Sequence, residues 1–231
     1  MTEHSLKRGA KISSPKALAA ATHYRPKIRA PENFITVPQQ ISMWGNSTYG
    51  DCVTAEEAFA KACHNSEIFI SDDEVIAWAT QHHVLEGADP VTVMTAMQTD
   101  GFPYGSYTED DGPFSMVNYR NSVDLQSAIS EGPVKMIVAA DQLEAVCTPG
   151  ETWFGVDFNS DTNYDHCVSL CGYGTIAWLA QQLGAQVPAG IDGTKPGYAM
   201  FTWDSIGIID TPSMIAVTSE AWLRSPTTLE R

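Results

Sequence analysis

Two stretches of the sequence contain the residue types that nucleophilic catalysis needs, and Cys52 lies in the first of them. The residues before Cys52 are turn-rich and those after it are apolar-periodic, so its thiol is predicted to stand at the start of a helix. The unpaired N–H groups there stabilise a thiolate and lower the pKa of the thiol. The amide of Asn46, six residues earlier, can direct a hydrogen-bond donor to the same point. A small buried cysteine is the structural alternative.

The second stretch begins at His166. Residues 166–173 have the composition of a strand, in which His166, Val168 and Leu170 share one face. A histidine at the start of such a strand projects past the edge of the sheet, where its imidazole can serve as the base for a cysteine nucleophile. A hydrogen-bonded boundary histidine is the alternative for this position.

The elements that must position these residues follow from periodicity and capping signals. Helices are predicted at residues 52–63, 71–83, 89–97, 122–131 and 176–183, and strands at residues 134–138, 166–173, 198–203 and 214–217. Residues 102–114 are predicted to form a loop. The front of the chain is therefore helical and the back is strand-rich, which indicates an α+β protein with a helical lobe at about 45–130 and a β lobe at about 131–225. Ligands favour the crevice between two such lobes.

The helix after Cys52 is predicted to be amphipathic. Its buried stripe is expected to consist of Ala55, Phe59, Ala62 and Cys63. The charged residues between them are expected to face outward; these are Glu56, Glu57 and Lys61.

Composition limits the class of protein. The 231 residues contain no apolar run long enough to span a membrane and no secretory signal, so a cytoplasmic location is expected. The five cysteines include no CxxC pair, so neither a disulfide framework nor a zinc site is expected. The adjacent His82 and His83 face different ways in a helix, and no metal or organic cofactor is predicted.

The charge is divided unevenly along the chain. Residues 1–29 carry a net charge of +6 and the remaining residues carry −21. The acidic body is expected to repel nucleic acid and anionic membranes, so neither is predicted as a partner. Residues 1–30 are predicted to form a basic, partly disordered arm, which can lie across the acidic body and plug a cleft.

Four segments, in the same order along the chain, resemble the papain-like cysteine peptidases. Residues 46–52 resemble the family's Gln-Gly-x-Cys-Gly-Ser-Cys stretch, and residues 125–139 resemble its helix-then-strand segment that ends in Pro-Val. Residues 165–174 are similar to its Asp-His-Ala-Val and Val-Gly-Tyr-Gly motifs, and residues 204–207 resemble Asn-Ser-Trp-Gly. The resemblance covers residues 31–231.

This resemblance implies a papain-like two-lobe fold, with an N-terminal helical lobe, a C-terminal antiparallel β-sheet or barrel lobe and an active-site cleft between them. It implies that Cys52 is the nucleophile, that His166 is its base, that Asp204 orients His166 and that Asn46 supplies the oxyanion hole. The implied reaction is hydrolysis of a peptide or amide bond through an acyl thioester. The acidic body favours a neutral or basic peptide or protein as substrate.

The sequence also departs from the family pattern at the positions that matter most. Asp51 replaces a small residue beside the thiol, Asn46 is one methylene shorter than the family's glutamine, and Asp204 stands in place of an asparagine. A catalytically inactive pseudoenzyme that serves as a binding or assembly module is therefore the alternative function. Other acyl-transfer chemistry on the same pair of residues is a third.

Overall fold

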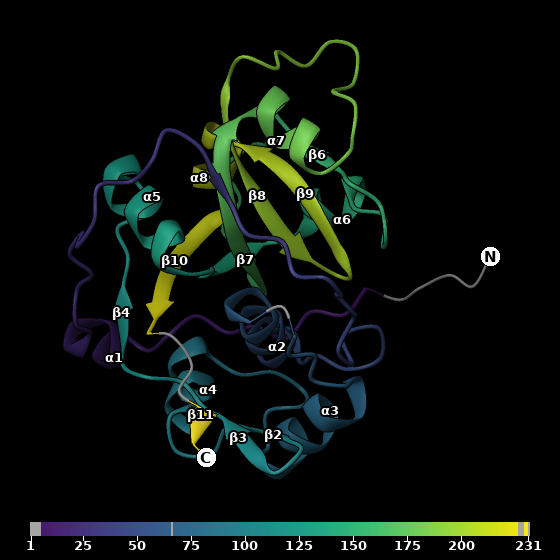
Figure 1. Cartoon of the computed structure of the whole chain (residues 1–231). Helices are drawn as coiled ribbons and strands as arrows, with labels where there is room; N and C mark the ends of the chain where they lie inside the picture. Colours follow the sequence, from purple (N-terminus) through teal and green to yellow (C-terminus); the bar gives the residue numbers. More distant parts are fainter. Residues whose placement is uncertain (1–5, 66, 226–228, 231) are drawn as a thin grey trace.

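A computed structural model describes residues 6–65, 67–225 and 229–230. A lobe built on a large sheet lies above a smaller helical lobe in Figure 1, and helix α2 (Cys52–His64) is the part of the helical lobe next to the sheet. This arrangement confirms the predicted α+β, two-lobe fold. Within the described residues, no helix combines the length and the apolar composition needed to cross a membrane.

The large sheet has the strand order β4-β10-β5-β7-β8-β9-β6, with β1 also paired to β7. Its strands are β1 (Phe34–Ile35), β4 (Phe114–Met116), β5 (Val134–Ala139), β6 (Phe154–Gly155), β7 (Tyr164–Thr175), β8 (Pro196–Thr202), β9 (Ser205–Asp210) and β10 (Thr218–Arg224). The described pairs are antiparallel except for β6 with β9. Because β7 pairs with β1, β5 and β8, it fixes the place of His166 near the start of this strand.

The helices divide between the two lobes. Around the sheet lie α5 (Ser122–Glu131), α6 (Asp141–Val146), α7 (Ile176–Gln182) and α8 (Thr211–Val217). The lower lobe contains α2, α3 (Asp72–Gln81), α4 (Pro90–Met97) and the small sheet of β2 (Phe102–Tyr104), β3 (Tyr107–Glu109) and β11 (Leu229–Glu230). The short helix α1 (Pro15–Ala20) lies in the N-terminal arm.

Local sequence signals explain most of these elements. They also explain why one predicted strand is a helix in the structure. Ser71 and Glu74 form a capping box at the start of α3, where a helix is predicted to begin. The strand predicted at residues 214–217 is wrong, because these residues belong to α8. The side chain of Asp210 caps this helix by accepting a hydrogen bond from the N–H of Ser213, and a proline occupies its first turn. The predicted loop at 102–114 also contains β2, β3 and the start of β4.

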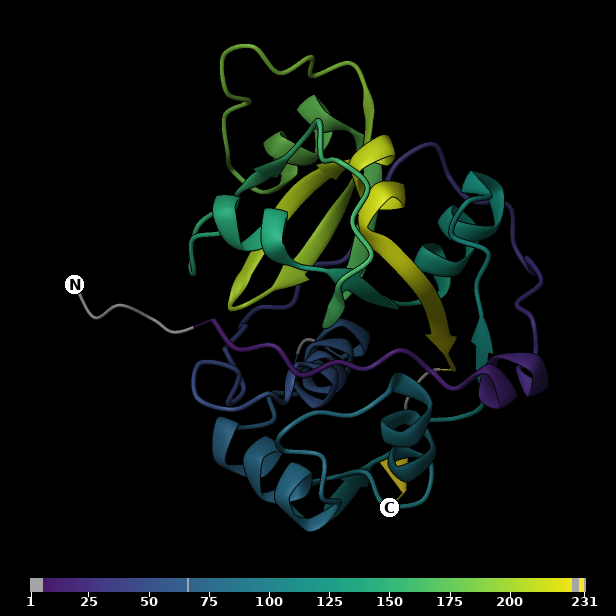
Figure 2. The same ribbon diagram turned by 180° about the vertical axis from the view of Figure 1, so that it is seen from behind.

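The N-terminal arm runs along both lobes. Figure 2 shows its purple trace crossing the molecule between the sheet above and the helices below. Residues 22–24 then pair with β4 through hydrogen bonds between Tyr24 and Met116 and between Met116 and Thr22. Residues 1–5 of the predicted arm lie outside the described residues. The arm's boundary at residue 30, its partial disorder and the lobe boundaries near residue 130 stay predictions.

The charged residues of α2 are buried, which corrects the prediction that they face outward. Glu56, Glu57 and Lys61 are each 1% exposed or less. Their partners come from the other elements packed on the helix: Asp111, Lys135 of β5 and Arg224 of β10. Sequence periodicity missed this network because it assumes a polar face turned to water, whereas α2 is enclosed by both lobes.

The network pairs each buried charge with an opposite one. Lys135 Nζ lies 3.0 Å from Glu56 Oε2, and it also donates to the carbonyl of Val53 at 2.9 Å. Arg224 lies 2.9 Å from Glu56 and 3.0 Å from Glu57. Burial alone would raise the pKa of Glu57, but Arg224 and Lys135 lower it to about 2. The ionised network therefore attaches α2 to the sheet lobe.

Removal of one cation from this network is expected to be strongly destabilising. Lys135→Met leaves Glu56 and Glu57 short of a partner, and an uncompensated buried charge costs about 3–5 kcal/mol. Urea denaturation should show a loss of that size in the free energy of unfolding. The matched control is Lys27→Met, whose side chain is 75% exposed, and it should change stability by less than about 0.5 kcal/mol. Equal effects of the two substitutions would contradict this account.

Candidate active site

Cys52 is the first residue of α2, as the sequence predicts, and it is 2% exposed. The backbone N–H of Cys167, the residue after His166, faces its thiol and favours the thiolate. This contact brings the start of α2 in the helical lobe against the start of β7 in the sheet lobe. The structure therefore brings together the two stretches that carry the predicted nucleophile and base.

His166 is held by the hairpin of β8 and β9. Its Nε2 lies 2.7 Å from Oγ1 of Thr202, and its ring stacks on Trp203 at a centroid distance of 4.0 Å and an interplanar angle of 16°. His166 is 1% exposed, and its Nδ1 has no hydrogen-bond partner among the described residues. Nδ1 is thus the ring nitrogen that is available for proton transfer.

Thr202 and Trp203 are site residues that the sequence analysis missed. They immediately precede Asp204 at the β8–β9 turn, where Trp203 and Asp204 have φ values of 43° and 56°. This two-residue turn reverses the chain at the point where the Thr202 hydroxyl reaches Nε2 of the imidazole. Thr202 lies near the end of the strand predicted at residues 198–203, and this position was the sequence signal that could have identified it. The role of Asp204 in orienting His166 stays a prediction.

Asn46 is buried in the loop before α2. Its Nδ2 donates to the carbonyl of Tyr49 at 3.0 Å, and its side chain lies beside the carboxyl of Asp51. The amide is therefore engaged within its own loop in this structure. Its predicted role as an oxyanion-hole donor requires that it turn toward Cys52, and that role stays a prediction.

Residues 7–11 of the arm occupy the space in front of Cys52. Ala10 donates its N–H to the carbonyl of Asp165 at 2.9 Å, and Lys11 donates to the carbonyl of Ala88 at 3.0 Å. Ala10 and Ala88 form a parallel bridge. These contacts join the arm to the β7 start on one side and to the helical lobe on the other.

The upstream end of the same segment contacts the loop and turn that flank the site. Lys7 donates its N–H to the carbonyl of Asn46 at 3.1 Å and accepts a hydrogen bond from the indole N–H of Trp203 at 2.9 Å. A hydrogen bond contributes about 0.5–1.5 kcal/mol, so three backbone hydrogen bonds and the one from Trp203 hold the segment firmly. We call residues 7–11 the occluding segment.

The side chain of Arg8 is the ionic anchor of the occluding segment. Its guanidinium contacts the carboxylates of Asp141 and Glu144 in α6, and it lies 3.0 Å from Asp165, the residue before His166. The positive charge of Arg8 faces an acidic cluster of the sheet lobe, as the uneven division of charge along the chain predicts.

Burial changes the pKa values of both candidate residues in this structure. Burial raises the pKa of Cys52 to about 12, even though the N–H groups of Cys167, Gly9 and Ala10 favour the thiolate. Burial and the charge of Arg8 lower the pKa of His166 to about 3. The prediction that the helix start lowers the pKa of Cys52 is therefore wrong for this closed state. Near neutral pH the pair consists of a thiol and a neutral imidazole.

Asp51 lies beside the thiol without adding a negative charge at neutral pH. Burial raises the pKa of its carboxyl to about 8, and the nearby Asn46 side chain reduces this effect. Asp51 is the N-cap residue of α2, but its side chain makes no capping hydrogen bond. A protonated carboxyl there opposes thiolate formation far less than a carboxylate would.

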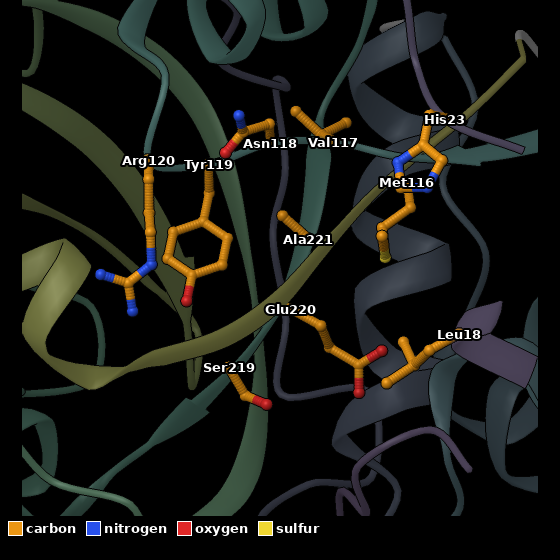
Figure 3. Close-up of a pocket in the computed structure, with 10 residues that line it drawn as sticks. All are labelled: Leu18, His23, Met116, Val117, Asn118, Tyr119, Arg120, Ser219, Glu220 and Ala221. Carbon is orange, nitrogen blue, oxygen red and sulfur yellow. The ribbon is translucent and has the colours of Figure 1, made fainter. Parts of the chain in front are cut away.

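An apolar hollow of about 450 Å³ lies elsewhere, between the arm and the β4–β10 edge of the sheet (Figure 3). Leu18 and His23 of the arm close one side of it, and none of the four predicted site residues lines it. Among the described residues, no group of three or more His, Cys, Asp or Glu side chains is placed to hold a metal ion.

Comparison with known proteins supports the fold. No family model and no curated protein match the chain. Xylellain, a cysteine protease from Xylella fastidiosa, superposes with a TM-score of 0.61 and 12% identity, over 96% of this chain and 97% of that one. The bromelain protease from Ananas comosus in complex with the E64 inhibitor gives a TM-score of 0.56 and 13% identity, over 85% and 99%.

A third similar structure is the proform of the ragweed pollen cysteine protease Amb a 11. It gives a TM-score of 0.63 and 11% identity, over 91% of this chain and 73% of that one. These three comparisons confirm the predicted resemblance at the level of fold. The chain has the two-lobe fold of papain-like cysteine proteases.

The raised pKa of Asp51 makes a pH-dependent prediction. An unfolded aspartate ionises near pH 4, so between about pH 4 and 8 the native carboxyl keeps a proton that the unfolded chain releases, and stability falls as the pH rises. Asp51→Asn removes this loss. Its free energy of unfolding, relative to wild type, should be greater at pH 8 than at pH 5 by on the order of 1 kcal/mol or more.

Urea denaturation at both pH values measures this difference, with Asp157→Asn at an exposed position as the matched control. If the free energy of unfolding of Asp51→Asn differs from that of wild type by the same amount at pH 5 and at pH 8, the carboxyl of Asp51 is ionised throughout this range.

Proposed function

We propose that this protein is a cysteine hydrolase that cleaves a peptide or amide bond, with Cys52 as nucleophile and His166 as base. The observation that supports it most is the junction of the two lobes, where the thiol at the start of α2 meets the His166–Cys167 backbone. The buried Nδ1 of His166, which has no hydrogen-bond partner among the described residues, supports the same assignment.

The reaction would proceed in two steps. Cys52 transfers its proton to Nδ1 of His166, and the thiolate attacks the substrate carbonyl carbon. The bond to the leaving nitrogen then breaks as His166 returns the proton to that nitrogen, which leaves an acyl thioester on Cys52. Water adds to the thioester, the C–S bond breaks, and the carboxylic acid and the free thiol are released. The stacked ring of Trp203 would stabilise the imidazolium and exclude water from it.

The occluding segment would keep this site closed in the resting chain. The N–H of Gly9 faces the sulfur and that of Ala10 donates to the carbonyl of Asp165, whereas nucleophilic attack requires a carbonyl carbon at the thiol. The segment is therefore bound in a way that blocks the thiol without offering a bond to cleave. Because it is tethered to the same chain, it competes at a high effective concentration with any free substrate.

The substrate is proposed to be neutral or basic. The occluding segment is itself basic, and its Arg8 is neutralised by three carboxylates of the sheet lobe. When the segment leaves, these carboxylates face an unshielded part of the cleft and favour positive charge.

A catalytically inactive binding module is the second candidate. The observations in its favour are the engagement of Asn46 with Tyr49 and the carboxyl of Asp51 beside the thiol. In that case the cleft would bind peptides without cleaving them, and Cys52 would remain a thiol after the occluding segment leaves.

Displacement of the occluding segment is expected to activate Cys52. A Cβ on Gly9 would lie 1.8 Å from the carbonyl oxygen of Gly50, so Gly9→Ala cannot keep the bound conformation. Alkylation of Cys52 by iodoacetamide at pH 6 should be at least about tenfold faster in this variant than in wild type. Mass spectrometry of the digested protein assigns the label to each cysteine.

Two comparisons make this experiment decisive. In Lys16→Ala, which changes an exposed residue of the same arm, Cys52 should be alkylated at the wild-type rate. The alkylation rates of the partly buried Cys63 and Cys147 report any general loosening of the fold. Equal labelling of Cys52, Cys63 and Cys147 in Gly9→Ala would favour the inactive module over the hydrolase.

The hydroxyl of Thr202 is expected to position His166. In the Gly9→Ala background, Thr202→Val should slow the alkylation of Cys52 at pH 6 by about tenfold, whereas Thr202→Ser should preserve it. If Asp204→Ala slows the reaction and Thr202→Val does not, then Asp204 is the orienting residue.

A further inference from the structure

The carboxyl of Asp51 is buried next to the candidate nucleophile and has no structural task there. Asp51 is 1% exposed, and neither of its side-chain oxygens has a hydrogen-bond partner among the described residues. It is the N-cap residue of α2, yet its side chain does not cap the helix. A buried polar group without a partner is costly, so its presence in a native structure calls for an explanation in terms of function.

The carboxyl of Asp51 packs against the loop that carries Asn46. A Cβ on Gly45 would lie 2.5 Å from Oδ2 of Asp51, so this oxygen touches the backbone immediately before Asn46. The side chain of Asn46 is 3% exposed and lies beside the same carboxyl, although no hydrogen bond joins the two groups in the closed state. Two of the positions at which the sequence departs from the papain-like pattern are therefore neighbours in space.

The surroundings of Asp51 favour its neutral form. The titratable groups that face it are all acids; these are Asp72 of α3, Glu86 of the turn after α3 and the thiol of Cys52. Asp72 accepts hydrogen bonds from the hydroxyl of Ser42 and the N–H of Gly45, whereas Asp51 accepts none. Burial then raises the pKa of Asp51 to about 8, so the carboxyl carries a proton at neutral pH.

A neutral carboxyl can do for Asn46 what a carboxylate cannot. The amide of Asn46 has one acceptor, Oδ1, and two N–H groups, and the carbonyl of Tyr49 takes one of these at 3.0 Å. A hydrogen bond from the O–H of Asp51 to Oδ1 would hold the amide with its second N–H free for an oxyanion. A carboxylate has no proton to donate and would attract that N–H to itself.

We propose that Asp51, as a neutral carboxylic acid, is the positioning residue that orients the amide of Asn46 toward the oxyanion formed at Cys52. This inference rests on the proposed function, because the oxyanion exists only if Cys52 attacks a carbonyl. The shorter amide and the acid that replaces a small residue then have one joint role in this chain. Ionisation of Asp51 would end that role.

Two reagents separate this role from the reactivity of the thiol. Both are applied to the full-length Gly9→Ala variant, in which the occluding segment is displaced. Iodoacetamide forms an S–C bond with Cys52 and releases iodide, and no oxyanion develops. With p-nitrophenyl acetate the thiol proton passes to His166, the sulfur attacks the carbonyl and an oxyanion forms. The ester C–O bond then breaks, p-nitrophenolate leaves and an acetyl thioester remains.

The rate of acetylation divided by the rate of alkylation measures stabilisation of the oxyanion, because both reactions need the thiolate. At pH 6, Asp51→Ala and Asn46→Ala should each lower this ratio by at least about tenfold, and the double variant should lower it no further. Asp51→Asn keeps a donor of the same shape and should preserve the ratio. Asp73→Ala, which removes an exposed carboxyl of α3, is the matched control.

The pH profile gives a second readout that a purely structural role would not move. With Asp51 present, the ratio should fall as the pH rises through about 8, because the carboxyl loses the proton that it donates. In Asp51→Asn the ratio should stay constant over the same range. A profile that is the same with aspartate and with asparagine at this position would overturn the inference.

The remaining outcomes distinguish this inference from the proposed function. If both reactions proceed and Asp51→Ala leaves their ratio unchanged, Asp51 does not position Asn46, but the hydrolase stands. Equal slowing of both reactions by Asp51→Ala would also overturn the inference, since it indicates a general disturbance of the site. If Cys52 reacts with neither reagent, in Gly9→Ala or in Arg8→Glu as a second way to displace the segment, the proposed function fails and the inference fails with it.

Discussion

The buried charges on α2 are the constraint on which the rest of the site depends. Glu56 and Glu57 are paired with Lys135 of β5 and Arg224 of β10, so the helix that carries Cys52 is attached to the sheet that carries His166. The two charges of a buried ion pair cannot move apart without leaving each one unpaired, and an unpaired buried charge is costly. The meeting of Cys52 with the start of β7 is therefore set by electrostatics inside the lobe junction as much as by apolar packing.

The second constraint is the occupant of that junction. Both catalytic candidates are buried at this occupied junction, and burial disfavours the thiolate and the imidazolium alike. A helix N-terminus stabilises a thiolate only while the thiol can be solvated or paired with a cation. The same two residues can therefore form a neutral, unreactive pair when covered and a reactive ion pair when open. Arg8 links these states, since its charge both anchors the segment and disfavours protonation of His166.

The sequence predicted the elements that carry the site better than the contacts within it. Cys52 at a helix start and His166 at a strand start are local features, readable from turn residues and periodicity. Thr202 escaped prediction because its role depends on the two-residue turn that follows it, and the family pattern drew attention to Asp204 instead. Burial of Lys61 could not be read from its own helix, because its partner Asp111 is fifty residues away.

The protonation state of His166 tests the central claim most directly. Nuclear magnetic resonance of the imidazole nitrogens, followed from pH 4 to pH 8, distinguishes the neutral ring from the imidazolium. In the unmodified chain the ring should stay neutral down to about pH 4, because burial and Arg8 lower its pKa. In Gly9→Ala it should be protonated at pH 6 and become neutral when Cys52 is replaced by alanine. An imidazolium at pH 6 in the unmodified chain, or the same titration in both proteins, would contradict the account.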